Sequence, residues 1–474
     1  MATPGRAAAL LLLPLLACIG GAAPAHGTAQ ARPVDGAVAM SPQAAARTPA
    51  ASSAPSGQAA GTGVEATPDS GTEAATTSVR STSKHQVSST PAPSPTSSPT
   101  PTPAPTPTPT PAPTQSPSGP WLGILQTSAA EAPTERAAGV SYGHLELSWA
   151  SYEPSPGVFD STYAANQRSK LSQLRQAGLQ VTLDAGLQYP PAWVFSLDSA
   201  TRFVDQYGDT WHGSLSEDVP DAVFDSNVRN AEAAYIARIA ADLGTGFDAV
   251  RAGGLLQDEL RYPDASYNGH TNCYWGFDAH AQATSPVPGW IPGQADSTKA
   301  SQFLAWYLQS IDGFESWLVG TYRSHFPTAW LQVLMPSWGL RPGDTTNAIA
   351  SDLNGSTPPA TWGTLEMGLD WANQVAVAQG DSRVMAYSTW LERGDDGTTP
   401  QTLGPAHYLV TLASPLGRPV AGENATATDS ISTMQTVVQR VKSWGLVGLM
   451  WLDEPQLFGS GPVHLTDLTG AFFS

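Results

Sequence analysis

The sequence predicts an α/β protein, a (β/α)8 TIM barrel preceded by a disordered Pro/Thr/Ser-rich linker. Two observations carry this prediction. Every Trp, Tyr and Phe lies at or after residue 121, so only residues 121–474 can bury a large core. Within them, eight short apolar runs alternate with helix-length patterned segments. Strand and helix in alternation favour a parallel sheet, and eight repeats predict its closure into a barrel.

The expected strands are short apolar runs, many of them rich in Val, Leu and Met. They cover 121–126, 142–149, 180–186, 249–256, 330–336, 383–389, 418–423 and 447–453. The clearest expected helices have apolar residues near helical spacing and cover 163–179, 227–244 and 300–326.

Residues 1–26 have the pattern of an export signal. Arg6 precedes an apolar run that is too short, and too interrupted by Pro and Gly, to span a membrane permanently. "LLAC" (15–18) resembles the lipobox of bacterial lipoproteins, in which Cys18 would be lipidated. The alternative is ordinary cleavage near "GAAPAHG", which removes Cys18. Both predict an extracellular protein, either secreted or lipid-anchored at the cell surface of a bacterium.

Residues 27–120 have the composition of a disordered linker. The first part is rich in Ala, Ser and Thr, and the second alternates Pro with Thr, Ser and Ala. Alternating Pro favours an extended chain of ~3.1 Å per residue. We expect a stalk that holds the 121–474 domain away from a cell wall or membrane surface, its second expected partner besides a carbohydrate.

Composition excludes several classes of function. The chain has 22 Lys and Arg against 40 Asp and Glu, and a net charge of −18, which repels nucleic acid. Histidines at 144, 212, 270 and 407 are scattered without ligand spacing, and no glycine-rich phosphate loop follows a strand. The sequence therefore predicts no nucleic-acid partner, no metal ion and no cofactor.

Carboxylates recur where the expected strands end, which is where a TIM barrel places its chemistry. They are Glu146, Asp184, Asp258, Glu259, Glu392, Glu423, Asp453 and Glu454. Seven tryptophans lie in or near the same loops, at 149, 193, 275, 290, 338, 390 and 451. Cleaving a glycosidic bond needs one carboxylic acid and a second carboxylate, and indole faces stack on sugar rings. The combination is typical of a sugar-cleaving site.

Glu259 and Glu423 are the best candidates for the two carboxyl groups. Apolar neighbours of Glu259 would raise its pKa and keep it protonated, whereas Arg261 would oppose this if it points at Glu259. Glu423, in "RPVAGENATA", follows the seventh expected strand. The alternative for either residue is a solvated ion pair or a helix N-cap.

Two runs around these glutamates resemble the β-amylases, the family 14 glycoside hydrolases. "DELRYPDASY" is similar to their G-E-L-R-Y-P-S-Y run and implies that Glu259 is the general acid. "VAGENATA" resembles their A-G-E-N-A-L run and implies that Glu423 is the general base. "STWLERGDDG" resembles their inner loop, which implies substrate contacts for Thr389 and Glu392. "YGHLELSW" resembles their second strand, whose sugar-binding acid maps onto Glu146.

The chain also departs from that family. "AGLQYPPAWV" (185–194) is expected to be a short connection where β-amylases have a long loop with a substrate-binding Asp. Its Pro-Pro-Ala-Trp resembles the family 42 β-galactosidases and their retaining clan, whose acid/base Glu follows an Asn. Asp258 stands in place of that Asn. A second Leu-Glu-Met, around Glu366, is expected to be helical (364–380).

The sequence thus predicts an extracellular glycoside hydrolase. Glu259 would protonate the leaving oxygen, and Glu423 would activate water in an inverting, β-amylase-like reaction. The alternatives are a retaining, β-galactosidase-like glycosidase, with Glu423 as nucleophile, and a non-catalytic carbohydrate-binding cell-surface protein. The expected substrate-binding residues are Glu146, Trp193, Arg261, Trp338, Thr389, Glu392 and Asn424.

Overall fold

The computed structural model describes residues 119–213, 217–351, 353–355, 363–394, 397–426 and 429–474. The expected signal peptide, Cys18 and nearly all of the 27–120 linker lie outside the described residues.

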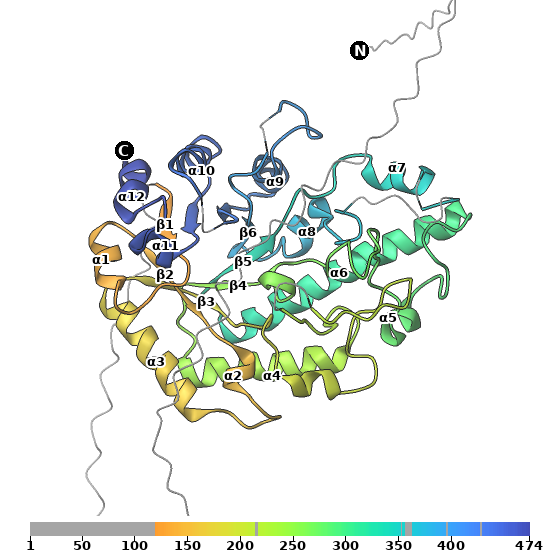
Figure 1. Cartoon of the computed structure of the whole chain (residues 1–474), viewed down its shortest axis with the longest axis horizontal. Coiled ribbons are helices and arrows are strands. Elements are labelled where there is room, and N and C mark those ends of the chain that lie inside the picture. The colour runs from red at the N-terminus through yellow and green to blue at the C-terminus, as the bar shows by residue number, and fades with distance from the viewer. Residues whose placement is uncertain (1–118, 214–216, 352, 356–362, 395–396, 427–428) are drawn as a thin grey trace, which may run out of the picture. The chain divides into compact units, whose positions relative to one another are not determined.

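Eight parallel strands form a closed barrel, in which each strand pairs with the next and the last pairs with the first. This confirms the predicted fold class. In Figure 1 the strands lie at the centre, with the long helices around them. The strands are β1 (Trp121–Ile124), β2 (Tyr142–Glu146), β3 (Gln180–Asp184), β4 (Ala249–Arg251), β5 (Trp330–Met335), β6 (Val384–Ser388), β7 (Val420–Glu423) and β8 (Gly448–Trp451).

The three expected helices correspond to α3 (Ser161–Gln176), α4 (Ser226–Leu243) and α6 (Ser297–His325). Each is capped at its N-terminus by an Asp, namely Asp160, Asp225 and Asp296. The side chain of each Asp accepts hydrogen bonds from backbone N–H groups in the first turn of its helix. The other helices are α1 (Ala132–Ala137), α2 (Trp149–Tyr152), α5 (Ala279–Thr284), α7 (Asp344–Ser351), α8 (Trp371–Val377), α9 (Pro405–Ala413), α10 (Ile431–Ser443), α11 (Glu454–Phe458) and α12 (Leu465–Phe473), with short 3₁₀ turns η1 (Ala192–Ser196), η2 (Leu256–Asp258) and η3 (Ser414–Leu416).

Two expectations about these elements were wrong. The fourth strand ends at Arg251 rather than at 256, because the chain turns sharply at Gly253. The segment around Glu366 is a series of turns rather than a helix, and α8 begins only at Trp371. Gly368 has a φ of +72°, a left-handed conformation that interrupts a helix.

The core has two layers. Side chains that point into the barrel form the inner layer: Trp121, Leu125, Tyr142, Ala249, Leu334, Met385, Tyr387, Ala421 and Met450. Alternate strand residues, such as Leu145 and Leu183, belong to the larger layer beneath the helices. Gly448 makes room for the inner layer, since a Cβ there would lie 2.0 Å from the Trp121 ring. The inner layer also holds buried polar side chains at mid-strand positions, namely His144, Thr182 and Gln332.

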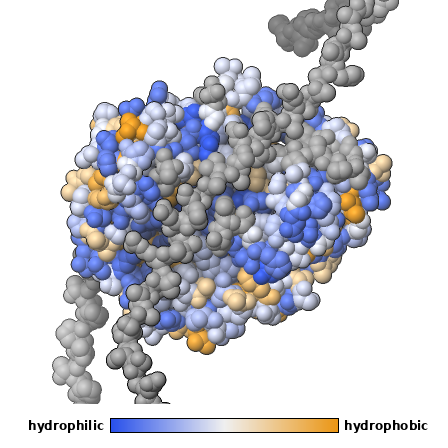
Figure 2. Space-filling model, viewed as in Figure 1, coloured by the Kyte–Doolittle hydropathy of each residue, from blue (hydrophilic) through white to orange (hydrophobic). Residues whose placement is uncertain are grey.

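The surface in Figure 2 is mostly hydrophilic, and its apolar residues are scattered. This pattern is that of an ordinary solvent-facing surface. Across the residues that the structure describes, no helix combines the length and the apolar character needed to cross a membrane.

Glu135, in α1, gives the first testable prediction. Burial, with the charge of Glu454 beside it, raises the pKa of Glu135 from 4.5 to about 9. The folded protein therefore holds a proton that the unfolded chain releases above pH 4.5, and stability from this group is lost as pH rises toward 9. In the wild-type protein this group makes the free energy of unfolding fall with pH by up to about 1.4 kcal/mol per pH unit. We expect Glu135→Gln to remove this dependence. Urea unfolding of both proteins between pH 5 and 8 measures it, and parallel curves would contradict the prediction.

Candidate active site

Polar side chains gather at the carboxyl ends of the strands, as predicted. Glu146 ends β2 beside Asp184 of β3, which is its partner in the strand register. Arg251 ends β4 and Glu423 ends β7. Each of these four positions alternates with a residue of the outer core, so their side chains face the barrel interior. The barrel mouth is therefore lined by charged side chains.

A tight turn after β4 positions Glu259. At Gly253 the chain passes so close to Asp258 that a Cβ on Gly253 would lie 1.6 Å from the Asp258 carbonyl oxygen. Gln257 and Asp258 then adopt positive φ values of 61° and 53°. Leu260 N–H donates to the Leu334 carbonyl of β5 at 2.9 Å, which returns the chain to the barrel. The glycine pair thus lets Glu259 stand at the barrel mouth although it lies beyond the end of the strand.

Glu259 is buried and held by two donors. Thr389 Oγ1 donates to Glu259 Oε1 at 2.8 Å, and Arg261 Nε donates to Oε2 at 3.0 Å. Burial raises the pKa of Glu259, while Arg261 and Thr389 lower it without cancelling the effect. Both sequence-based expectations about Glu259 are confirmed, namely desolvation by apolar surroundings and opposition by Arg261. A carboxyl group in this state is suited to donate a proton.

Glu423 has a different environment. Arg251 donates to both of its oxygens, at 2.8 Å from Nη1 and 3.3 Å from Nη2, and Tyr387 Oη donates at 2.8 Å. Hydrogen bonds from a guanidinium are charge-assisted, and together with the tyrosine hydroxyl they fix the orientation of this carboxyl group. Glu423 is therefore suited to act as a base or a nucleophile. The two glutamates influence each other, since the charge of Glu423 also raises the pKa of Glu259.

Arg251 joins the two sides of this site. Besides Glu423, its guanidinium contacts Asp258 Oδ2 at 3.3 Å, and Asp258 Oδ1 accepts from Gly254 N–H at 2.9 Å. Sequence reasoning missed the role of Arg251. One signal was available: an Arg inside the apolar run "AVRAGGLL" must find a carboxylate partner if the strand is buried.

Glu146 and Asp184 form a second acidic pair. Tyr189 Oη donates to Glu146 Oε1 at 3.1 Å, and burial together with the charge of Asp184 raises the pKa of Glu146 to about 7. His144 lies near them, with Nε2 4.0 Å from Asp184 Oδ2. Burial lowers the pKa of His144 well below its usual range, so its imidazole is neutral. The predicted location of Glu146 at a strand end is thus observed, and its contact with sugar stays a prediction.

Two other predicted site residues join loops to one another. Asn424 is fully buried: its Nδ2 donates to the Leu452 carbonyl at 3.0 Å, and its Oδ1 accepts from Leu452 N–H at 2.9 Å. Glu392 Oε2 accepts from Ala425 N–H at 3.0 Å. Asn424 therefore connects the loop after β7 to the loop after β8. Glu392, in the loop after β6, also bonds to the loop after β7. Both contacts position the segment that follows Glu423.

The tryptophans divide into two groups. Trp149, Trp275 and Trp451, which the sequence places in or near strand-end loops, are among the most deeply buried side chains. Their place near strand ends reflects packing beneath the loops. Trp193 and Trp338 are half-buried, and Trp193 Nε1 donates to the Glu153 carbonyl at 2.9 Å. Stacking of a sugar on Trp193 or Trp338 stays a prediction.

The connection after β3 is not short. It runs from residue 185 to Asp225, the N-cap of α4, and carries η1. It also brings Glu217 to the site, where the backbone N–H of Gln257 donates to Glu217 Oε2. Burial raises the pKa of Glu217 to about 7, and the charge of Glu259 contributes. Sequence reasoning missed this third carboxyl group because nothing local to it indicates a strand end.

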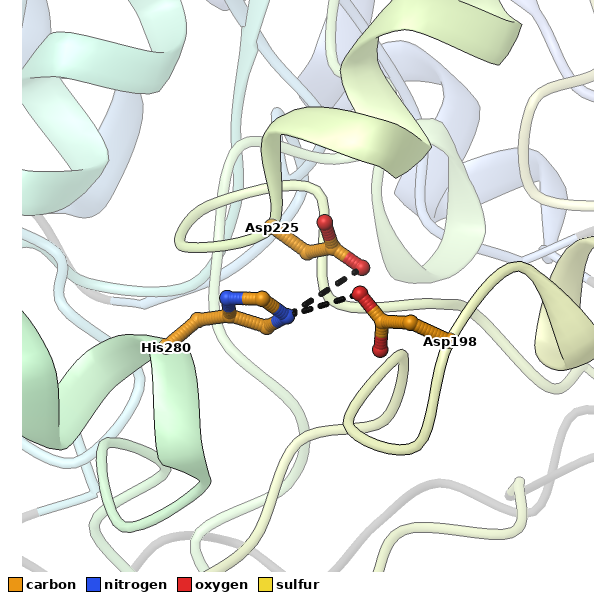
Figure 3. Close-up of side chains that lie close together, drawn as sticks. All are labelled: Asp198, Asp225 and His280. Carbon is orange, nitrogen blue, oxygen red and sulfur yellow. Dashed lines mark hydrogen bonds and ion pairs between the residues drawn. The ribbon is translucent and has the colours of Figure 1, made fainter.

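The connections after β3 and β4 also bring together Asp198, Asp225 and His280 (Figure 3). The oxygen and nitrogen atoms that these side chains offer lie within 4.8 Å of one another, so they could hold a metal ion. The sequence could not indicate this group, because its three members are far apart in the chain and none has a second ligand at close spacing.

The chain is an eight-stranded parallel α/β barrel with charged side chains at its mouth. No protein-family model matches the chain, and no curated protein matches it in sequence. Among solved structures, it is similar to the catalytic domain of β-amylase from Paenibacillus polymyxa, with a TM-score of 0.58 and 16% identity over 74% of this chain and 97% of that one. It is also similar to the β-galactosidase from the psychrophilic Marinomonas ef1, with a TM-score of 0.51 and 12% identity over 74% of this chain and 59% of that one. At these identities the likeness shows a shared barrel fold.

Proposed function

We propose that the barrel is a glycoside hydrolase that cleaves O-glycosidic bonds of a poly- or oligosaccharide. One observation carries the proposal: two buried glutamates lie at the barrel mouth with different hydrogen-bond partners. Burial raises the pKa of Glu259, whereas Glu423 accepts hydrogen bonds from Arg251 and Tyr387. Glycosidic cleavage requires this division between an acid and a carboxylate. The two similar solved structures are both named as glycosidases, which supports the proposal.

The mechanism follows from the contacts. Glu259 donates its proton to the glycosidic oxygen as the bond to the anomeric carbon breaks. Thr389 and Arg261 hold its carboxyl group in place and accommodate the negative charge left behind. Glu423, oriented by Arg251 and Tyr387, either takes a proton from the attacking water or attacks the anomeric carbon itself. Arg251 keeps the two carboxyl groups chemically distinct because it contacts Glu423 and not Glu259.

The finer proposal is an inverting, β-amylase-like reaction on an α-glucan. It rests on the sequence runs around Glu259 and Glu423, and on a barrel that spans 97% of the β-amylase catalytic domain. The alternative is a retaining, β-galactosidase-like reaction. Pro-Pro-Ala-Trp after β3 and the likeness to the Marinomonas barrel favour that alternative.

The test is release of reducing sugar by the purified full chain from starch, maltooligosaccharides, β-galactans and β-glucans. We expect turnover of the α-glucans. Proton NMR of the product before it mutarotates should then show inversion at the anomeric carbon. Turnover of a β-galactan with retention would support the alternative. Glycan binding with no turnover of any substrate across the pH range would instead support a non-catalytic carbohydrate-binding protein.

We also propose that the protein is extracellular, secreted or lipid-anchored on a bacterial cell surface, where residues 1–26 direct export and 27–120 form a stalk. The support is the composition of these residues. Mass spectrometry of the protein recovered from its host distinguishes a lipid-modified Cys18 from a cleaved N-terminus.

A further inference from the structure

A group of three side chains lies between two connections of the barrel. Asp198 follows η1 in the β3–α4 connection, and Asp225 ends that connection as the N-cap of α4. His280 lies in the first turn of α5, within the connection from β4 to α6. In Figure 3 both carboxylates point at the same nitrogen of the His280 ring. Asp198 Oδ2 lies 2.9 Å from His280 Nε2, and Asp225 Oδ2 lies 3.8 Å from it.

One carboxylate oxygen of Asp225 lacks a hydrogen-bond partner, and the contact between Asp198 and His280 does not provide one. Asp225 is completely buried, and its Oδ1 accepts from Asn227 N–H at 2.7 Å to cap α4. Its Oδ2 is buried without a hydrogen-bond partner and is directed into the group. A buried carboxylate oxygen without a partner is costly, whereas a bound cation would satisfy it.

The donor set indicates the class of cation. Two carboxylate oxygens and one imidazole nitrogen suit Zn²⁺ or a similar transition-metal ion, whereas Ca²⁺ prefers oxygen ligands alone. Ligand atoms around a tetrahedral Zn²⁺ lie ~3.4 Å apart, given bonds of about 2.1 Å. The separations of 2.9 and 3.8 Å lie on either side of that value. Asp198 and His280 are one-quarter to one-third exposed, which leaves an entry path and room for a water ligand.

The charges of the group agree with this. A hydrogen bond from the Ala200 backbone N–H holds the pKa of Asp198 below its usual range, so Asp198 is an anion. Burial raises the pKa of Asp225, and the charge of Asp198 contributes to the rise. A divalent cation would offset the repulsion between these two carboxylates.

We propose that Asp198, Asp225 and His280 bind one Zn²⁺ ion, which clips the β3–α4 connection to the β4–α6 connection. The first connection carries Glu217, and the second carries Glu259 and Arg261. The ion therefore acts as a structural clip on the two loops that build one side of the barrel mouth. This inference is independent of the reaction proposed above.

The experiment is calorimetric titration of ZnCl₂ into the full chain after treatment with a chelator. We expect one Zn²⁺ per chain, and at least about tenfold weaker binding in His280→Gln and in Asp225→Asn. Asn at 225 retains the oxygen that caps α4, so this variant should fold normally. The matched control is His270→Gln, because His270 also lies near a carboxylate, 3.6 Å from Asp209, but among the described residues it belongs to no group of three possible ligands.

A second measurement is the midpoint of thermal unfolding with and without ZnCl₂. We expect Zn²⁺ to raise it in the wild-type protein and in His270→Gln, and not in the two ligand variants. The proposal is overturned if no saturable binding at one ion per chain occurs, if both ligand variants bind as the wild type does, or if His270→Gln weakens binding equally. Binding of CaCl₂ in preference to ZnCl₂ would also overturn it.

Discussion

Glu259→Gln is expected to lower kcat by about 10²–10⁴-fold on an unactivated glycan, because the variant cannot supply the proton that the leaving oxygen needs. Gln has nearly the same shape and can keep the hydrogen bond from Thr389 Oγ1, and Arg261, which loses Glu259 Oε2 as an acceptor, still pairs with Asp264. The loss should therefore arise from chemistry rather than from folding. The measurement is kcat and KM on the substrate identified above, together with the thermal unfolding midpoint of the variant.

The loss should depend on the leaving group. Dinitrophenolate is a leaving group that departs from a glycoside without being protonated. The same variant should therefore recover most of its activity on a dinitrophenyl glycoside. Glu232→Gln is the matched control, since Glu232 is a buried glutamate of α4 outside the barrel mouth. It should retain wild-type kcat. Equal losses on both substrates would show that Glu259 does not act as the acid.

Glu423→Gln is expected to cause a loss of similar or larger size, about 10²–10⁴-fold or more in kcat, on every substrate. The amide can neither take a proton from water nor attack carbon. An activated leaving group should not restore activity, in contrast with Glu259→Gln. The kinetics of the two variants on one pair of substrates therefore separate the two roles.

The stability of Glu423→Gln must be measured beside its kinetics. Glu423 forms a buried ion pair with Arg251, and in the variant Arg251 keeps its contact with Asp258 Oδ2. Removing one member of a buried ion pair is destabilising, by about 3–5 kcal/mol in the usual case. Azide added to Glu423→Ala gives an independent test, since a small anion can occupy the space beside Arg251 and react with the anomeric carbon. A folded Glu423→Gln protein with full kcat would refute the assignment.

The pKa behaviour of Glu259 could be predicted because its causes are local in the chain. The apolar "AGGLL" precedes Glu259, and Arg261 is two residues away. Both influences on its pKa therefore lie within a few residues of Glu259 in the sequence. The environment of Glu423 could not be predicted in the same way. Its main partner, Arg251, lies 172 positions away in the chain. Only closure of the barrel brings β4 and β7 close enough for that contact.

The tryptophans and the length of the β3–α4 connection show a second limit. An indole near a strand end can face a ligand or pack beneath a loop, and the sequence is the same in both cases. Trp149 is buried against Trp193 and Tyr235, at ring-centroid distances of 5.8 and 5.2 Å. These partners come from η1 and α4, so the burial of Trp149 depends on how the segments pack.

The sequence by itself predicted the barrel, which the structure confirms, and it indicated Glu259 and Glu423 as candidates for the two carboxyl groups. The spacing of apolar residues along the chain indicates where strands and helices alternate. In a parallel barrel the carboxyl ends of all strands lie at the same end. Only the tertiary structure decided the partners: Arg251 with Glu423, Glu217 beside Glu259, and His280 with Asp198 and Asp225. The physical reason is that periodicity specifies which face of an element a side chain occupies, whereas distances between remote side chains exist only once the barrel has closed.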